Sequence, residues 1–338
     1  MNPNWRSFLE SADAVFADGS AELLNFGDAA AELQAAATHT VVVPLTHLGL
    51  ISARGEDAKS FLHNQFTSDI NHLADNQAQH AAWCSAKGRM LASFLVWRED
   101  DTYTMTLAAD LQDAVMKRLQ MFVLRAKVKL TNPSAETVLL GISGAQAAEV
   151  LQDAGLPCPE EPLSRASAGG ATVVGLDSDR FLVACPQADC ATLWQKLTVK
   201  ARPAGLPAWR WLDVQRAFPL VTLATKEEFV PQMADFEKIG GVSFHKGCYP
   251  GQEIVARTQY LGKVKRHLYR LSAEQSMQSG EDLFSPENPD QACGKIMSAA
   301  ASPAGGHVAL AVVQANFANS LHLQSREGPD VQATAVNP

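Results

Sequence analysis

The sequence lacks any stretch that would place it in a membrane or a secretory pathway. Its beginning, MNPNWRSFLE, contains no apolar signal core. No run of about 18 apolar residues occurs anywhere in the 338-residue chain. We therefore expect no membrane span and a cytoplasmic protein.

The cysteines lack the spacings typical of metal and redox motifs. No C-x-x-C pair occurs, and the neighbouring Cys185 and Cys190 have no His or Cys pair nearby that would complete a zinc site. Such cysteines normally stay reduced in a cytosolic protein of this size. We expect no metal ion and, because clustered ligands are missing, no iron–sulfur cluster held by this chain alone.

Positive charge is in the minority. The chain has 28 Lys and Arg against 36 Asp and Glu, a net charge of −8. Because an acidic chain has no overall field that attracts phosphates, we expect no direct nucleic-acid binding. A local basic patch is compatible with this balance, and Lys263, Lys265 and Arg266 are its densest candidate.

The first third of the chain alternates strand and helix patterns. Residues 41–53 read as β structure interrupted at Pro44, and residues 55–66 have helical spacing. Two apolar runs joined by the Lys-Gly-Arg at 87–89 predict a hairpin, and residues 110–124 predict an amphipathic helix.

The pattern then resets. From 126 to 204 the order is β-β-α-β-β-α, which is typical of a compact α+β lobe. After about residue 262 only short strands punctuated by Gly, Pro and Asn follow, and these predict a small antiparallel barrel.

The segment KGCYPGQE, from Lys246 to Glu253, concentrates reactive side chains. Cys248 follows Lys246 by two residues, and a nearby ammonium favours the thiolate over the thiol. His245 is close in sequence, but no third group completes a nucleophilic triad. From the residues alone, a tight turn is the simpler interpretation and a reactive site is the alternative.

Two glycines in this segment suit close approach to a ligand. Gly247 and Gly251 relieve steric limits on the backbone, and we expect at least one of them at positive φ. Gln252 offers a donor and an acceptor, and Glu253 is an acceptor when ionised. The same composition therefore serves a ligand cradle as well as a turn.

KGCYPGQE resembles the signature K-G-C-Y-x-G-Q-E of the folate-binding YgfZ family. That family is related to the aminomethyltransferase (T-protein) of the glycine cleavage system. Three further segments are similar to the family: GEDAKSFLHNQFTSDI, AWCSAKGRMLASFLVWR and FVPQM. The flanks of the signature in GGVSFHKGCYPGQEIVART, followed by Gly262 and Lys265-Arg266, are similar as well, so the resemblance spans about 55 to 266.

The resemblance implies an α+β, three-lobed T-protein-like fold. Ferredoxin-like lobes would surround a central folate channel, and a β-barrel would end the chain. The expected domains are a folate-binding lobe formed by 1–125 with 205–255, a ferredoxin-like lobe at 126–204, and the barrel at 256–338.

The resemblance also implies a function. The family binds tetrahydrofolate or a derivative and supports assembly or repair of iron–sulfur enzymes, including the enzyme that methylthiolates tRNA. Those enzymes or their assembly machinery would be the partners. The alternative is a folate-dependent one-carbon transferase with an altered substrate, which would need a base beside the folate.

The implied site centres on the signature. Cys248 and Lys246 would be the catalytic residues, with Cys248 either a nucleophile or a transient cluster ligand. A carboxylate that the sequence does not identify would hold the pterin, and Arg257 and Arg266 are candidates for the anionic tail. The residues implied in folate or loop binding are Gly247, Tyr249, Gly251, Gln252, Glu253, Gln232, Arg257 and Arg266.

Two departures from the T-protein pattern bear on activity. Where those relatives carry an Asp pair after the central hairpin turn, this chain has Ala92 and Ser93, neither of which is a carboxylate base. Gln215, Arg216 and Ala217 replace a Glu-Ala-Gly run. We therefore expect no glycine-cleavage aminomethyltransferase activity.

Overall fold

The structure is a computed structural model that describes residues 1–262, 264–288 and 290–336. By internal packing the chain divides into two compact units, each built from several separate segments. The first unit is Met1–Ala58, Leu73–Gln79 and Leu95–Trp209. The second unit is Lys59–His72, His80–Phe94 and Arg210–Pro338. The three-domain division made from the sequence stays a prediction.

Eight α-helices and five 3-10 helices occur among the described residues. The α-helices are α1 Pro3–Ser11, α2 Ala29–Thr38, α3 Ala58–Gln65, α4 Gln112–Val123, α5 Ala147–Asp153, α6 Cys190–Leu197, α7 Leu206–Gln215 and α8 Gln252–Tyr260. The 3-10 helices are η1 Ile70–His72, η2 Ala109–Leu111, η3 Leu223–Thr225, η4 Pro231–Ala234 and η5 Ala315–Phe317.

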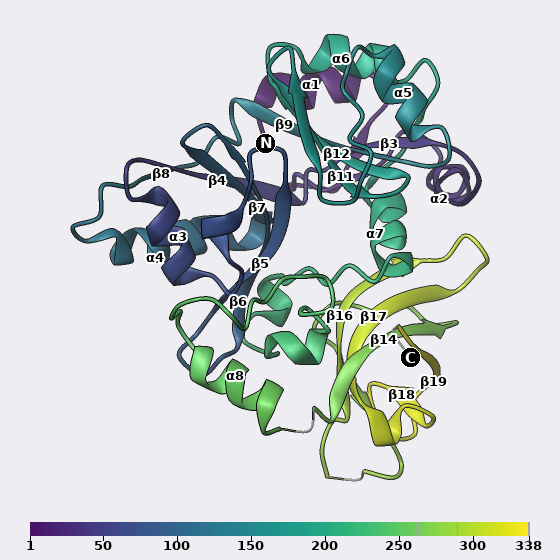
Figure 1. Ribbon diagram of the computed structural model, residues 1–338. Helices are drawn as coiled ribbons and strands as arrows, with labels where there is room; N and C mark the ends of the chain where they lie inside the picture. The colour runs from purple at the N-terminus through teal and green to yellow at the C-terminus, as the bar shows by residue number, and fades with distance from the viewer. Residues whose placement is uncertain (263, 289, 337–338) are drawn as a thin grey trace. The chain divides into compact units, whose positions relative to one another are not determined.

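A six-stranded sheet organises much of the first unit, in the order β10-β11-β12-β9-β3-β13. Its strands are β3 Val41–Pro44, β9 Thr137–Ser143, β10 Arg165–Ala168, β11 Ala171–Asp177, β12 Arg180–Pro186 and β13 Arg202–Pro203. α1, α5 and α6 lie on one side of this sheet (Figure 1). On the other side, Trp209 of α7 packs against Gly141, where an added Cβ would lie 2.4 Å from the indole.

A five-stranded sheet has the order β5-β6-β7-β4-β8. Its strands are β4 Leu48–Arg54, β5 Ala78–Cys84, β6 Met90–Glu99, β7 Thr102–Ala108 and β8 Lys129–Thr131. A separate short pair joins β1 Val15–Phe16 to β2 Leu23–Asn25.

The position of β8 corrects one expectation. The β-β-α-β-β-α pattern grouped this strand with β9, but β8 pairs antiparallel with β4. Both edges of β9 are already occupied, by β12 and β3, so β8 completes the free edge of β4 instead. Strand pairing at a distance along the chain decides this grouping, and the local pattern does not encode it.

The end of the chain forms the predicted barrel, closed in the order β14-β17-β16-β15-β18-β19. Its strands are β14 Arg266–Ala273, β15 Asp282–Phe284, β16 Gly294–Ala301, β17 His307–Gln314, β18 Leu321–Leu323 and β19 Asp330–Ala335. β14 and β17 pair along their whole lengths, from Arg266 opposite Gln314 to Ala273 opposite His307. Closure leaves no free strand edge in the barrel.

The predicted hairpin between β5 and β6 is also present. Ser85 N donates to the Arg89 carbonyl at 2.8 Å, and Gly88 N donates to the Ser85 carbonyl at 2.9 Å. Gly88 has φ of 71°, which a turn this tight requires.

No helix among the described residues is long and apolar enough to cross a membrane.

Candidate functional site

The signature loop is anchored to the end of α3 through Lys246. This side chain is buried, with 9 % of its surface exposed. Its ammonium donates to the main-chain carbonyls of His63 and Phe66, which belong to the last turn of α3 and the residue after it. Unpaired carbonyls at a helix C-terminus carry partial negative charge, so they are a natural acceptor for a cation.

Burial changes the acid–base behaviour of Lys246. Desolvation lowers the pKa of its ammonium to about 8, against the opposing attraction of Asp69 and Cys248. The Nζ also lies 4.9 Å from the centroid of the Tyr249 ring. Burial raises the pKa of Tyr249, so the phenol stays neutral beside the amine.

Cys248 differs from the other cysteines of the chain. It is the exposed one, whereas Cys158 is half-buried and the rest are buried. Burial raises the pKa of the Cys84 and Cys185 thiols to about 12 and that of Cys190 to about 11. Cys248 is therefore the thiol best placed to meet a partner or reagent in solution.

An imidazole–carboxylate cluster that the sequence analysis missed lies beside the loop. His63 Nδ1 is 3.2 Å from Asp69 Oδ1, and His72 Nδ1 is 2.8 Å from Asp69 Oδ2. A Cβ added to Gly247 would lie 3.6 Å from His63 Nε2, so the ring faces the signature backbone. The family-like segment 55–70 contains His63 and Asp69, but nothing in that segment indicates that they pair.

Burial and neighbouring charges shift the pKa values of His63 and Asp69. Burial lowers the pKa of His63, the charge of Lys246 lowers it further, and Asp69 opposes both. For Asp69, burial raises the pKa, but the hydrogen bond from His72 and the nearby imidazoles bring the net pKa below its usual value. Near neutral pH the cluster therefore pairs an ionised carboxylate with a mainly neutral His63.

Gly251 fixes the far end of the loop. Its φ is 79°, which confirms the expectation that one of the two glycines has positive φ. A Cβ there would lie 2.3 Å from the Ser85 carbonyl and 2.7 Å from Gly88 Cα. The loop thus packs backbone to backbone on the hairpin turn, and α8 begins directly after it.

Of the other residues implied in binding, Gln232 is buried and holds α8 in place, whereas the rest lie on α8 or line a groove. Gln232 is buried in η4 and donates to the Val255 carbonyl at 2.8 Å, so it positions α8. Gln252 and Glu253 form the first turn of α8, and Glu253 is exposed there. Arg257 and Arg266, from α8 and β14, line a groove of about 780 Å³.

The positions that the resemblance assigns to the T-protein Asp pair, Ala92 and Ser93, hold no base. Ala92 is fully buried, and the buried Ser93 Oγ accepts from Val221 N at 2.9 Å. Ala217, which stands where those relatives have glycine, has φ of 53°. This left-handed conformation is one that glycine adopts without strain.

A buried histidine lies among aromatic rings in the second unit. The His80 ring centroid is 5.3 Å from that of Phe218 and 6.3 Å from that of Phe236. Burial lowers the pKa of His80 to about 4, so the imidazole is neutral. Its Nδ1 is buried without a hydrogen-bond partner in the described part of the chain. This is an apolar setting with one unsatisfied polar atom, and sequence reasoning did not single it out.

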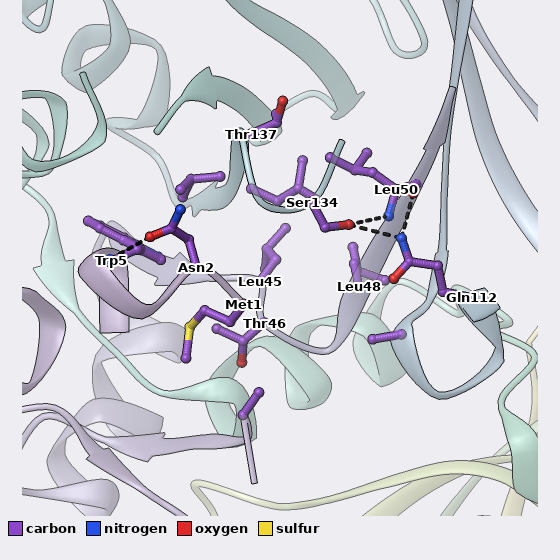
Figure 2. A pocket seen from close by; sticks show the side chains of 14 residues that line it. Met1, Asn2, Trp5, Leu45, Thr46, Leu48, Leu50, Gln112, Ser134 and Thr137 are labelled. Carbon is purple, nitrogen blue, oxygen red and sulfur yellow. Dashed lines mark hydrogen bonds between the residues drawn. The ribbon is translucent and has the colours of Figure 1, made fainter. Parts of the chain in front are cut away.

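The first unit contains a separate pocket of about 220 Å³, shown in Figure 2. Gln112 Nε2 donates there to Asn132 Oδ1 and Ser134 Oγ at 2.8 and 2.9 Å, and Ser134 Oγ accepts from Leu50 N. These polar groups satisfy one another, and none of the implied site residues lines the pocket.

Within the described residues, no group of three or more His, Cys, Asp or Glu is arranged to hold a metal ion.

Comparisons with known proteins identify relatives. Residues 12–161 match the family model described as the GCVT N-terminal domain. The tRNA-modifying protein YgfZ of Cronobacter sakazakii is 31 % identical over 246 residues, which cover 72 % of this chain and 74 % of that protein. The protein of the same name from Escherichia coli O157:H7 is 31 % identical over 255 residues, 73 % and 78 % of the two chains.

A solved structure is similar over nearly the whole chain. The glycine cleavage system aminomethyltransferase T from Bartonella henselae superposes with a TM-score of 0.76 at 20 % identity, covering 98 % of this chain and 95 % of the other. This likeness confirms the expected T-protein-like fold.

Proposed function

Because this chain belongs to the YgfZ family, we propose that it is a folate-binding accessory protein for iron–sulfur enzymes. It would support their assembly or repair, including that of the enzyme that methylthiolates tRNA. The curated relatives are named tRNA-modifying proteins, which agrees with that client.

The observation that carries the proposal is the exposed Cys248 on an anchored loop. Lys246 ties the loop to the end of α3, and Gly251 ties it to the hairpin turn. A single accessible thiolate suits transient ligation of iron or sulfur, because the client can supply the remaining ligands.

We propose that the second unit holds the pterin of a reduced folate beside His80. A flat heterocycle suits the rings of Phe218 and Phe236, and the unsatisfied His80 Nδ1 offers it one hydrogen bond. We propose Arg257 and Arg266 for the anionic tail. Bound folate would supply a one-carbon carrier; the chain's own residues would orient it and exclude water.

A one-carbon transferase with an altered substrate is the second candidate. Ala92 and Ser93 supply no base for it. His63 and Asp69 form a titratable pair beside the signature loop, and they favour this alternative if their substitution abolishes a transfer reaction.

We also propose a cytoplasmic location. All six cysteines are free thiols, and the role assigned to Cys248 needs a compartment that keeps thiols reduced.

Complementation of a deletion strain tests the proposal. A Cys248→Ala variant should fold and should bind tetrahydrofolate like the wild type, as followed by the fluorescence of the six tryptophans. It should fail to restore the iron–sulfur enzymes, measured by tRNA methylthiolation. Cys158→Ala is the matched control and should restore them. Full restoration by Cys248→Ala would refute the thiolate role.

A further inference from the structure

The groove beside α8 is strongly positive. It has a volume of about 780 Å³ and lies within the second unit. None of the described residues that line it is acidic. Five cations line it: Lys87, Arg89, Arg257, Lys265 and Arg266. In a chain with an excess of acidic residues, this is a local concentration of one sign of charge.

Most of these cations are not neutralised. Arg89 donates to the main-chain carbonyls of Glu227 and Glu228, which occupies part of its guanidinium. Four cations have no ion-pair partner in the described ranges of the chain: Lys87, Arg257, Lys265 and Arg266. Lys263, which the sequence places in the same patch, lies outside the described residues. The groove therefore offers several unpaired cations to an anion.

The walls of the groove are held in place by backbone packing. A Cβ on Gly88 would lie 2.9 Å from Ile254 Cβ, so the hairpin turn is in close contact with α8. Gln232 holds the middle of that helix through the Val255 carbonyl. Arg266 begins β14 opposite Gln314 of β17. The cations project from a fixed framework, which reduces the ordering cost of binding.

We propose that this groove binds the phosphate backbone of RNA. A lining of one sign matches a chain of phosphodiesters, which carries one charge per nucleotide. Tyr260 and Leu261, at the end of α8, are 64 % and 84 % exposed, and they offer an aromatic face and an apolar face to unstacked bases. A groove that binds an acidic protein surface normally combines cations with other polar and acidic side chains. None of the described residues that line this groove is acidic, which favours RNA instead.

The expectation of no nucleic-acid contact rests on the net charge of −8. Net charge describes the field far from the molecule. At contact distance, within a Debye length of roughly 10 Å, the local cations dominate. The proposal goes beyond the accessory role above, because it requires neither folate nor Cys248. Arg257 and Arg266, which we propose for the folate tail, also line this groove, so the assays below contain no folate and the double variant leaves both arginines in place; the two proposals can therefore fail separately.

Fluorescence anisotropy of the purified full chain with a labelled, unmodified tRNA transcript tests the groove. With four unpaired cations, the logarithm of affinity should fall against the logarithm of salt concentration with a slope of about −3. The affinity should therefore drop roughly 60-fold between about 50 and about 200 mM salt. Absence of binding at the lower salt concentration would overturn the proposal.

A double variant locates the binding. Lys87→Gln with Lys265→Gln removes two exposed cations, so the slope should halve and the affinity at about 0.1 M salt should fall roughly 30-fold. The matched control is Lys59→Gln with Lys117→Gln, two exposed lysines that do not line the groove, and it should change the affinity less than about twofold. Equal losses in the two double variants would overturn the proposal.

A competition separates phosphate from carboxylate recognition. Polyglutamate, added at the same concentration of negative charge, should displace the labelled tRNA poorly. Displacement as strong as that by unlabelled tRNA would assign the groove to acidic protein segments and would also overturn the proposal.

Discussion

Replacing Lys246 by methionine probes how the signature loop is held. Methionine has a similar length but neither charge nor donor, so the carbonyls of His63 and Phe66 lose their partner. Against this loss stands the penalty of burying the ammonium. Its pKa falls from 10.5 to about 8. Keeping the proton in the folded state therefore costs about 3 kcal/mol, at about 1.4 kcal/mol per pKa unit.

The sign of the pH dependence follows from this lowered pKa. Between pH 8 and 10.5 the unfolded chain binds more protons at Lys246 than the folded chain, so the free energy of unfolding rises with pH there. From about pH 7 to about pH 9.5 the wild type should gain about 2 kcal/mol relative to Lys246→Met. Titrations shared by both proteins cancel in this difference.

Urea unfolding at those two pH values measures the effect. The free energy of unfolding of the wild type minus that of Lys246→Met should be larger at the higher pH. Lys59→Met, at an exposed lysine, is the matched control, and its difference from the wild type should be the same at both pH values. A difference for Lys246→Met that does not change with pH would contradict the burial of its ammonium.

Three further predictions concern the same loop and its surroundings. Gly251→Ala should destabilise the chain by about 2 kcal/mol or more in urea unfolding, because positive φ and the contact with the hairpin turn both exclude a Cβ. Gly19→Ala, with positive φ but open space, should cost about 1 kcal/mol; equal losses would contradict the contact. Alkylation at neutral pH followed by peptide mapping should modify Cys248 first, and modification of a buried cysteine at the same rate would contradict its exposure. A reconstituted glycine-cleavage assay should show no aminomethyl transfer, because Ala92 and Ser93 replace the carboxylates; robust turnover would refute this.

The parts of the fold that were predicted correctly from the sequence are those encoded by short stretches of consecutive residues. The hairpin at Gly88 and the barrel after α8 depend on turn residues and strand alternation, which are written in consecutive positions. The partner of β8 depends on which strand edge is free, and that is a property of the assembled sheet.

The candidate site divides in the same way. Lys246 and Cys248 could be predicted from the signature because they lie two positions apart in the sequence. His80 carries no such mark, since its neutral state and unsatisfied Nδ1 arise from rings contributed by distant segments. The sequence also contains no sign that Lys246 binds the main-chain carbonyls at the end of α3, the contact that anchors the signature loop.

One helix joins the two surfaces proposed here. α8 begins at Gln252, with Gly251 as its N-cap directly after the Cys248 loop, and Arg257 of the same helix lines the basic groove. The helix has nine residues, and the buried Gln232 holds it at its middle. Binding in the groove that shifts α8 would therefore also shift the backbone at Gly251. Because Gly251 packs without clearance on the hairpin turn, even a small shift there must be taken up by the loop that carries Cys248.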